Sequence, residues 1–127
     1  MIMSKSLIER LRRARETDVV SHGITFVVRR PTDLEVSMMN EAASNRGLMQ
    51  STLIMNHVVG WKDVTELMLV PGGGPDPVAF DKAIFCEYIG DHPEHWDAIA
   101  SAVMDGYKRH RDAMDESLKN SLPGSPE

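Results

Sequence analysis

The chain has 127 residues, of which 42% are apolar and 26% are charged. This length fits one domain with a substantial core, and the composition is that of a globular protein rather than a disordered one. No stretch approaches the roughly 18 apolar residues that a membrane-spanning helix needs, and the N-terminal segment lacks the apolar centre of a secretory signal. The single cysteine, Cys86, excludes an internal disulfide. We therefore expect a cytoplasmic protein.

Charge is distributed unevenly along the chain. Residues 1–30 contain seven lysines and arginines against three acidic residues, and the remainder contains seven against sixteen, which gives the net charge of −5. The acidic majority argues against a general nucleic-acid binder, because such a protein needs a broad basic face. The basic segment remains suited to an anionic surface, including the acidic part of a second copy.

The first element is predicted to be a basic helical arm. Residues 4–16 carry Leu7, Ile8 and Leu11 on one side of a helix, and arginines occupy most of the other side. Because this apolar side is narrow, the helix needs a partner surface. We assign residues 1–22 to this arm.

A strand and a helix follow. Residues 24–30, ITFVVRR, are β-branched and aromatic, which predicts a strand that ends at Pro31. Thr32 and Glu35 have the spacing of a capping box at the start of a helix. This second helix carries apolar residues at helical spacing, namely Leu34, Met38, Met39 and Ala42.

The remaining elements are predicted to be mostly helical. Residues 48–59 favour a helix, with a strand through their β-branched end as the competing interpretation. Helices are also predicted from Asp81 to residue 89 and over residues 94–118, the last with Trp96, Ile99, Val103 and Tyr107 facing inward. Residues 119–127, KNSLPGSPE, have the composition of a disordered tail.

These elements predict a mainly α fold. Residues 23–118 form a single helical domain with a minor β element. That β element consists of the strand near 24–30 and a short hairpin around 64–80.

A glycine triplet raises the question of a phosphate-binding loop. Gly72, Gly73 and Gly74 lie between prolines in VPGGGPDP. A Walker loop needs a lysine and a hydroxyl after its last glycine, and a dinucleotide fingerprint needs a helix that begins there. Neither is present, so we interpret the segment as a wide turn that joins residues 67–70 to residues 78–80.

For the other candidate residues, a structural role is better supported than a chemical one. Cys86, His92 and His95 cluster in sequence, but a structural zinc site needs four ligands and a fourth is not evident. Cys86 also falls within an apolar helix, where an inert thiol is the commoner outcome. The acids Asp112, Asp115 and Glu116 are expected on an exposed helix end rather than in a cleft. We predict no catalytic, cofactor-binding or metal-binding residue.

The chain contains nine methionines, which is a notable number for its length. Five of them fall in its middle part, namely Met38, Met39, Met49, Met55 and Met68. Methionine fills irregular cores, and it also lines adaptable binding grooves because its side chain is flexible and polarizable. Both interpretations remain open at this point.

Short motifs in their order along the chain carry a resemblance to a known family. The residues concerned are Val59, Gly60, Trp61, Val64, Pro77, Val78, Phe80, Pro93 and Trp96. In this arrangement the chain resembles, over residues 24–107, the small tail assembly chaperones of long-tailed bacteriophages and prophages. It departs from their pattern at Asp63, where the family has glycine, and at Ala79, where the family has proline.

The resemblance implies a mainly helical, non-enzymatic binding protein. Such chaperones hold the long tape measure protein until tail tube subunits polymerise around it, and they are absent from the finished virion. They can self-associate, and a frameshifted longer form can bind the tail tube protein. On this basis we expect Met38 and Met39 to line part of the client groove.

Three rival classes remain. The first is another small phage structural module, such as a head–tail connector or a tail completion protein, which stays in the virion. The second is an enzyme or a metal protein that uses Cys86, His92 and His95. The third is a DNA-binding regulator that uses the basic arm.

Overall fold

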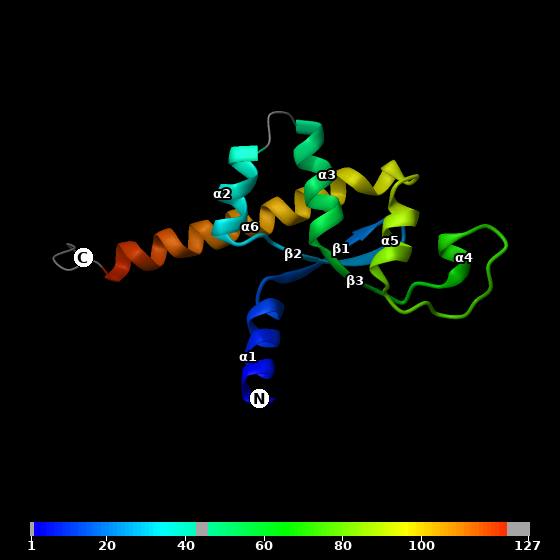
Figure 1. Ribbon diagram of the computed structural model, residues 1–127, viewed down its shortest axis with the longest axis horizontal. Coiled ribbons are helices and arrows are strands. Elements are labelled where there is room, and N and C mark those ends of the chain that lie inside the picture. Colours follow the sequence, from blue (N-terminus) through cyan, green and yellow to red (C-terminus); the bar gives the residue numbers. More distant parts are fainter. Residues whose placement is uncertain (1, 43–45, 122–127) are drawn as a thin grey trace.

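The computed structural model describes residues 2–42 and 46–121, and it shows an antiparallel sheet packed against helices (Figure 1). The sheet has three strands in the order β1-β2-β3. The elements in chain order are α1 (Ile2–Arg13), β1 (Glu16–Ser21), β2 (Ile24–Arg29), α2 (Asp33–Ala42), α3 (Arg46–His57), β3 (Val58–Lys62), α4 (Glu66–Leu69), α5 (Lys82–Ile89), the 3₁₀ turn η1 (Pro93–His95) and α6 (Trp96–Ser121).

A tight hairpin joins the first two strands. His22 and Gly23 both have positive φ, at 47° and 82°, and Ser21 pairs with Ile24 across the turn. Two consecutive residues in this conformation match the right-handed twist of the flanking strands, which is why such turns dominate two-residue hairpins. The His-Gly pair therefore continues the sheet instead of ending a helical arm.

The third strand completes the sheet next to β2. Helix α3 ends at His57, and β3 begins at Val58 without an intervening loop. Phe26 pairs with Trp61, and a register shift lies between Val27 and Val28. The β-branched end of the predicted helix is thus a strand, as the competing interpretation held.

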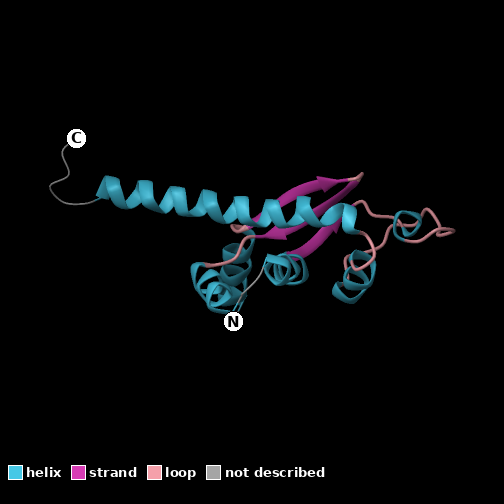
Figure 2. Ribbon diagram, turned by 90° about the horizontal axis from the view of Figure 1, so that it is seen from above, coloured by secondary structure: helices cyan, strands magenta, loops and turns pink. Residues whose placement is uncertain are grey.

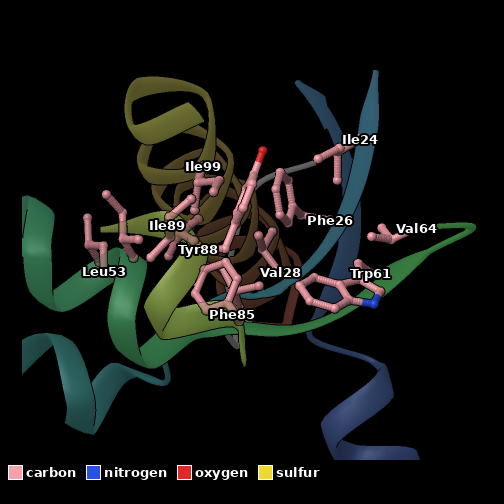
Figure 3. Close-up of a cluster of buried hydrophobic side chains, with 13 residues drawn as sticks. Ile24, Phe26, Val28, Leu53, Trp61, Val64, Phe85, Tyr88, Ile89 and Ile99 are labelled. Carbon is pink, nitrogen blue, oxygen red and sulfur yellow. The ribbon is translucent and has the colours of Figure 1, made fainter. Parts of the chain in front are cut away.

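One face of the sheet supplies the core. On β2 the side chains alternate, and Ile24, Phe26 and Val28 are buried while the intervening residues are half-buried. This period of two directs one side of the strand to the helices. Figure 3 shows these side chains meeting those of α3, β3, α5 and α6. The partners include Leu53, Ile54, Trp61, Val64, Phe85, Tyr88, Ile89, Ile99 and Val103.

Helix α6 runs beside the strands and is the longest element (Figure 2). Its first half contacts β1, β2 and α3, and it buries Ile99 and Val103, as predicted. Residues 111–120 are exposed, and this part of the helix extends past the other elements. The amphipathic pattern of α6 ends where its contacts with the sheet end.

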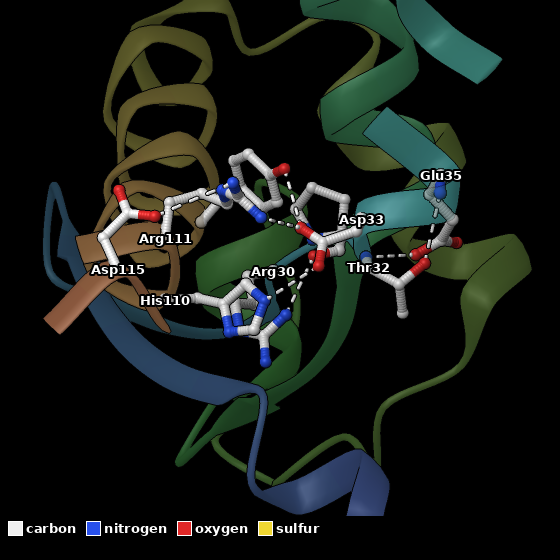
Figure 4. A network of polar contacts seen from close by, with 9 residues as sticks. Arg30, Thr32, Asp33, Glu35, His110, Arg111 and Asp115 are labelled. Atoms are coloured by element: carbon white, nitrogen blue, oxygen red, sulfur yellow. Dashed lines mark hydrogen bonds and ion pairs between the residues drawn. The ribbon is translucent and has the colours of Figure 1, made fainter. Parts of the chain in front are cut away.

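Helix α2 is fixed to α6 by its first residues (Figure 4). The capping box is confirmed: Thr32 Oγ1 accepts a hydrogen bond from the Glu35 amide at 3.1 Å, and Glu35 accepts one from the Thr32 amide at 2.8 Å. The Tyr107 hydroxyl donates to Asp33 at 2.8 Å, and this hydrogen bond is the main cause that lowers the pKa of Asp33. Arg111 also pairs with Asp33, at 3.5 Å.

The predicted mainly α class is wrong, because the protein is an α+β domain with a three-stranded antiparallel sheet. The predicted strand at 24–30 is confirmed as β2, but it lies at the centre of the sheet. Residues 16–21 form β1 instead of part of the predicted helical arm, and the adjacent Val19 and Val20 point to opposite faces, with Val19 half-buried and Val20 exposed.

Other predicted boundaries also differ from the structure. The hairpin around 64–80 is reduced to one isolated bridge between Thr65 and Pro77, and helix α4 occupies part of that segment. Within the predicted tail, residues 119–121 continue α6, and residues 122–127 lie outside the described part of the chain.

Candidate functional site

The candidate binding site is a surface pocket of about 320 Å³ between α3, the end of α5 and the start of α6. Its lining is mainly apolar, and Ile54, Met55, Ile89 and Trp96 supply most of it. Gln50, Ser51 and Gly90 complete the lining. A mainly apolar concavity with a few polar groups at its edge is the usual form of a binding site.

Two hydrogen bonds hold the walls of this pocket in place. The Trp96 indole nitrogen donates to the Ile89 carbonyl oxygen at 2.8 Å, which joins the start of α6 to the end of α5. The Gln50 amide donates to the Asp97 carboxylate at 2.8 Å, which joins α3 to α6. The pocket therefore lies between elements that are tied to one another, and it is formed before any ligand binds.

The two predicted partner-binding methionines are not part of this pocket. Met38 is 60% exposed on α2, whereas Met39 packs against the core. Consecutive helical residues point in directions about 100° apart, so Met38 and Met39 have different surroundings, and their contact with a client stays a prediction. Met55 is the methionine that the structure places at the pocket, with 39% of its surface exposed. The sequence indicated Met55 only as one of the five methionines in the middle part of the chain.

Two further apolar surfaces are exposed. Leu7, Ile8 and Leu11 lie on α1, which extends away from the sheet in Figure 1. Leu34 and Met38, one helical turn apart, are exposed on α2. Contiguous exposed apolar residues in a globular protein mark surfaces for other macromolecules.

The histidines that drew attention in the sequence form a buried polar cluster with residues from β1 and α5. His95 is 1% exposed, and its two ring nitrogens lie 2.8 Å from Ser21 Oγ and 3.0 Å from the Tyr88 hydroxyl oxygen. His92 stacks on the Tyr88 ring, with 3.8 Å between the ring centroids, and His22 meets His95 edge to face. No sequence pattern pointed to Ser21 or Tyr88 as partners of His95. Ser21 lies 74 positions before His95, and only the fold brings the two side chains together.

Hydrogen bonds within the protein occupy the His95 ring. Both ring nitrogens of His95 are used within the protein, and burial lowers the pKa of His95, so the ring is neutral near pH 7. Cys86 packs against the hydrophobic core. Within residues 2–42 and 46–121, no three histidine, cysteine or acidic side chains gather closely enough to hold a metal ion.

The glycine triplet encloses a carboxylate of the protein itself. The Gly74 amide donates to Glu66 Oε1 at 2.7 Å, and the Gly73 amide donates to the Val70 carbonyl oxygen at 3.1 Å. Gly72 has a φ of 84°, which explains a glycine at that position of the turn. Amides that would face a phosphate are thus already hydrogen-bonded to α4 and the residue that follows it.

The predicted exposed acids lie on the distal part of α6. Asp112, Asp115 and Glu116 are all exposed, and Asp115 pairs with Arg111 at 3.9 Å. They do not line either of the two described pockets.

Residues that carry the family resemblance contact one another. The Trp61 indole nitrogen donates to the Val78 carbonyl oxygen at 2.8 Å, and the Trp61 and Phe80 rings meet edge to face with centroids 5.0 Å apart. The Val78 amide donates to the Val64 carbonyl oxygen at 2.7 Å. Two motifs separated in the sequence therefore form one structural unit.

Comparisons with protein-family models, with curated proteins and with solved structures give no match for this chain. None of the helices in the described part of the chain combines the length and apolar content that a membrane crossing needs.

Proposed function

We propose that this protein is a non-enzymatic tail assembly chaperone of a bacteriophage or prophage, and that it binds the tape measure protein in the host cytoplasm. The single observation that carries the proposal is the apolar pocket between α3, α5 and α6. A tape measure protein is long and helical, and an amphipathic helix binds by inserting apolar side chains into such a concavity.

The composition of the pocket supports this kind of client. Met55 supplies a flexible, polarizable side chain, and Trp96 supplies a large aromatic surface. Gln50 and Ser51 at the edge offer polar contacts to the solvent side of a bound helix. These properties suit a client that presents many similar helical segments instead of one fixed sequence.

The contacts between the motif residues give a second line of support. The Trp61–Val78 hydrogen bond and the Trp61–Phe80 ring contact join residues of two motifs that carry the resemblance. The proposal thus rests on residues that build one part of the fold, as well as on their order in the sequence.

Exposed apolar side chains on α1 and α2 extend the proposed binding surface. Met38 and Leu34 are available on α2 for a client or a second copy, and Leu7, Ile8 and Leu11 are available on α1. The net charge of −5 helps to keep a protein with such surfaces soluble.

Co-expression with a tape measure protein tests the proposal through three matched variants. Met55→Asp places a charge at the pocket, Met38→Asp places one on α2, and Leu67→Asp places one on α4, where Leu67 is also exposed. We expect Met55→Asp to abolish co-purification, Met38→Asp to weaken it, and Leu67→Asp to leave it unchanged.

Circular dichroism of each variant shows whether the fold is retained. A folded Met55→Asp variant that still co-purifies with the client would contradict the assignment of the pocket. Equal losses in all three variants would show that added negative charge, not the pocket, decides the interaction.

A further inference from the structure

A second pocket, of about 380 Å³, lies where the turn after α1, the end of β2 and α6 meet. Its lining is mainly polar, and three arginines from these three elements contribute to it: Arg15, Arg30 and Arg109. Glu16, Gly106 and His110 lie beside them. The whole chain has a net charge of −5, whereas this pocket is lined by three positively charged guanidinium groups.

None of the three arginines forms a direct ion pair within the described part of the chain, although the Asp33 carboxylate acts on Arg30 from a greater distance. Among the described side chains, no carboxylate oxygen lies within 4.0 Å of a charged nitrogen of Arg15, Arg30 or Arg109. The Glu16 carboxylate is held by Arg29 at 2.9 Å. Glu16, which follows Arg15 directly in the sequence, is thus paired with an arginine other than the three that line the pocket.

Hydrogen-bonding capacity is also left over. Arg15 Nε is buried and has no hydrogen-bond partner among the described residues, although Arg15 Nη1 donates to the Leu11 carbonyl oxygen. Within the described residues the Arg30 side chain makes one hydrogen bond, from Nη1 to the Pro31 carbonyl oxygen at 3.1 Å. The described residues thus accept hydrogen bonds from only part of the guanidinium donors that line the pocket, and the other donors are available to an added acceptor.

Two arginines of the pocket, Arg15 and Arg30, repel each other. Burial lowers the pKa of Arg30, and the charge of Arg15 lowers it further. Gly106 allows α6 to approach Arg30 closely. A Cβ at position 106 would lie 3.3 Å from Arg30 Cβ, which is a tight contact. The repulsion would be relieved by an anion between the guanidinium groups.

We propose that this pocket binds a phosphate-class oxyanion. Guanidinium groups present their donors in a planar fork that matches phosphate oxygens, and hydrogen bonds between ionised groups are stronger than neutral ones. Three such groups suit a doubly charged anion better than a single carboxylate. The site shares no residue with the apolar pocket, and the proposal does not depend on the proposed function.

Isothermal titration of the full chain with inorganic phosphate tests this site, at constant ionic strength set by sodium chloride. We expect saturable binding with one site per chain. Arg109→Gln removes an exposed guanidinium of the pocket and is expected to weaken binding by at least about tenfold. Arg109→Lys, which keeps the charge but loses the fork, is expected to fall between this variant and the wild type.

Arg111→Gln is the matched control. Arg111 lies two positions further along α6 and pairs with Asp33 and Asp115 instead of lining the pocket, so this variant is expected to bind phosphate as the wild type does. A parallel titration with pyrophosphate distinguishes the source of the group: tighter binding assigns a diphosphate, and equal binding assigns a single phosphate.

Two results would overturn the proposal. The first is the absence of saturable binding to either probe by the folded wild-type chain. The second is an equal loss of affinity in Arg109→Gln and Arg111→Gln, which would show that the probes respond to overall charge and not to this pocket.

Discussion

The indole nitrogen of Trp61 donates a hydrogen bond to the carbonyl oxygen of Val78 at 2.8 Å. Trp61 belongs to β3, and Val78 belongs to the extended segment that leads to α5. The bond therefore ties the edge of the sheet to the chain that enters the helical layer, across the loop that contains the glycine triplet. It also joins the two motifs on which the family resemblance depends.

Removal of this bond is expected to destabilise the fold. Trp61 is 8% exposed, and Trp61→Phe retains an aromatic ring but leaves the Val78 carbonyl oxygen without its donor. We expect the free energy of unfolding, measured by urea denaturation, to fall by about 1–3 kcal/mol. The neighbouring Lys62→Gln removes only an exposed ion pair with Asp18 and should leave stability almost unchanged. A wild-type midpoint for Trp61→Phe would contradict this role.

The hairpin turn offers a second test through glycine. Gly23 has a φ of 82°, and a Cβ there would meet no atom within 4 Å, so Gly23→Ala introduces backbone strain without a steric clash. We expect a loss of about 1–2 kcal/mol in the free energy of unfolding. Gly90→Ala is the control, because Gly90 has a right-handed helical φ of −60° and room for a methyl group. Equal effects of the two substitutions would show that φ at Gly23 is not limiting.

The extent of the sheet is the part of the fold that sequence patterns failed to predict. The strand at 24–30 was predictable because its first five residues are all β-branched or aromatic, and the capping residues located the start of α2. By contrast, residues 16–21 are half-exposed at the edge of the sheet and contain few apolar residues, so their periodicity is weak. His22-Gly23 also reads as a break, because the sequence alone does not show that both residues adopt positive φ.

The pocket was less predictable than the fold for a similar reason. Methionines were an apparent signal, but Met38 and Met39 lie on different sides of α2, and the pocket is lined instead by residues of α3, α5 and α6 that are distant in sequence. Trp96 was predicted to face inward on the last helix and was one of the motif residues, but no sequence pattern placed it at a pocket. Its position beside Ile54 and Met55 follows from how α3 packs on α6, which is a tertiary property.

The glycine loop gives a third prediction with two adjacent positions. A Cβ on Gly73 would lie 2.7 Å from the Glu66 carbonyl oxygen, so Gly73→Ala must displace backbone and is expected to cost about 1–3 kcal/mol. A Cβ on Gly74 would lie 3.6 Å from the end of the Glu66 side chain, which is an ordinary contact. Thermal denaturation of both variants should therefore show a clear loss for Gly73→Ala and a smaller one for Gly74→Ala. The reverse order would contradict the loop geometry.

Stability is expected to fall in mild acid because of two buried histidines. Burial is the main cause that lowers the pKa of both His57 and His95 below the ordinary value of 6.5. The unfolded chain therefore binds these protons more tightly than the folded chain does. Their contribution to stability is complete above about pH 6.5 and is lost as the pH falls from there through the folded pKa values.

The slope of stability against pH measures this effect. Each histidine contributes at most about 1.4 kcal/mol per pH unit, so denaturant titrations between pH 7 and pH 5 should show a decline that is smaller in His95→Gln than in the wild type. The comparison uses slopes, because His95→Gln also removes hydrogen bonds to Ser21 and Tyr88 and lowers stability at every pH. An identical slope in the two proteins would show that His95 does not contribute.

The proposed chaperone function is tested most directly by co-expression of the tagged wild-type chain with a tape measure protein, followed by purification and by mass spectrometry of assembled tails. The account predicts that the tape measure protein stays soluble, co-purifies with several copies of this chain, and loses those copies in the finished tail. A tape measure protein that aggregates regardless of this chain would contradict the account. So would persistence of the chain in the finished tail, which is the behaviour of a structural module.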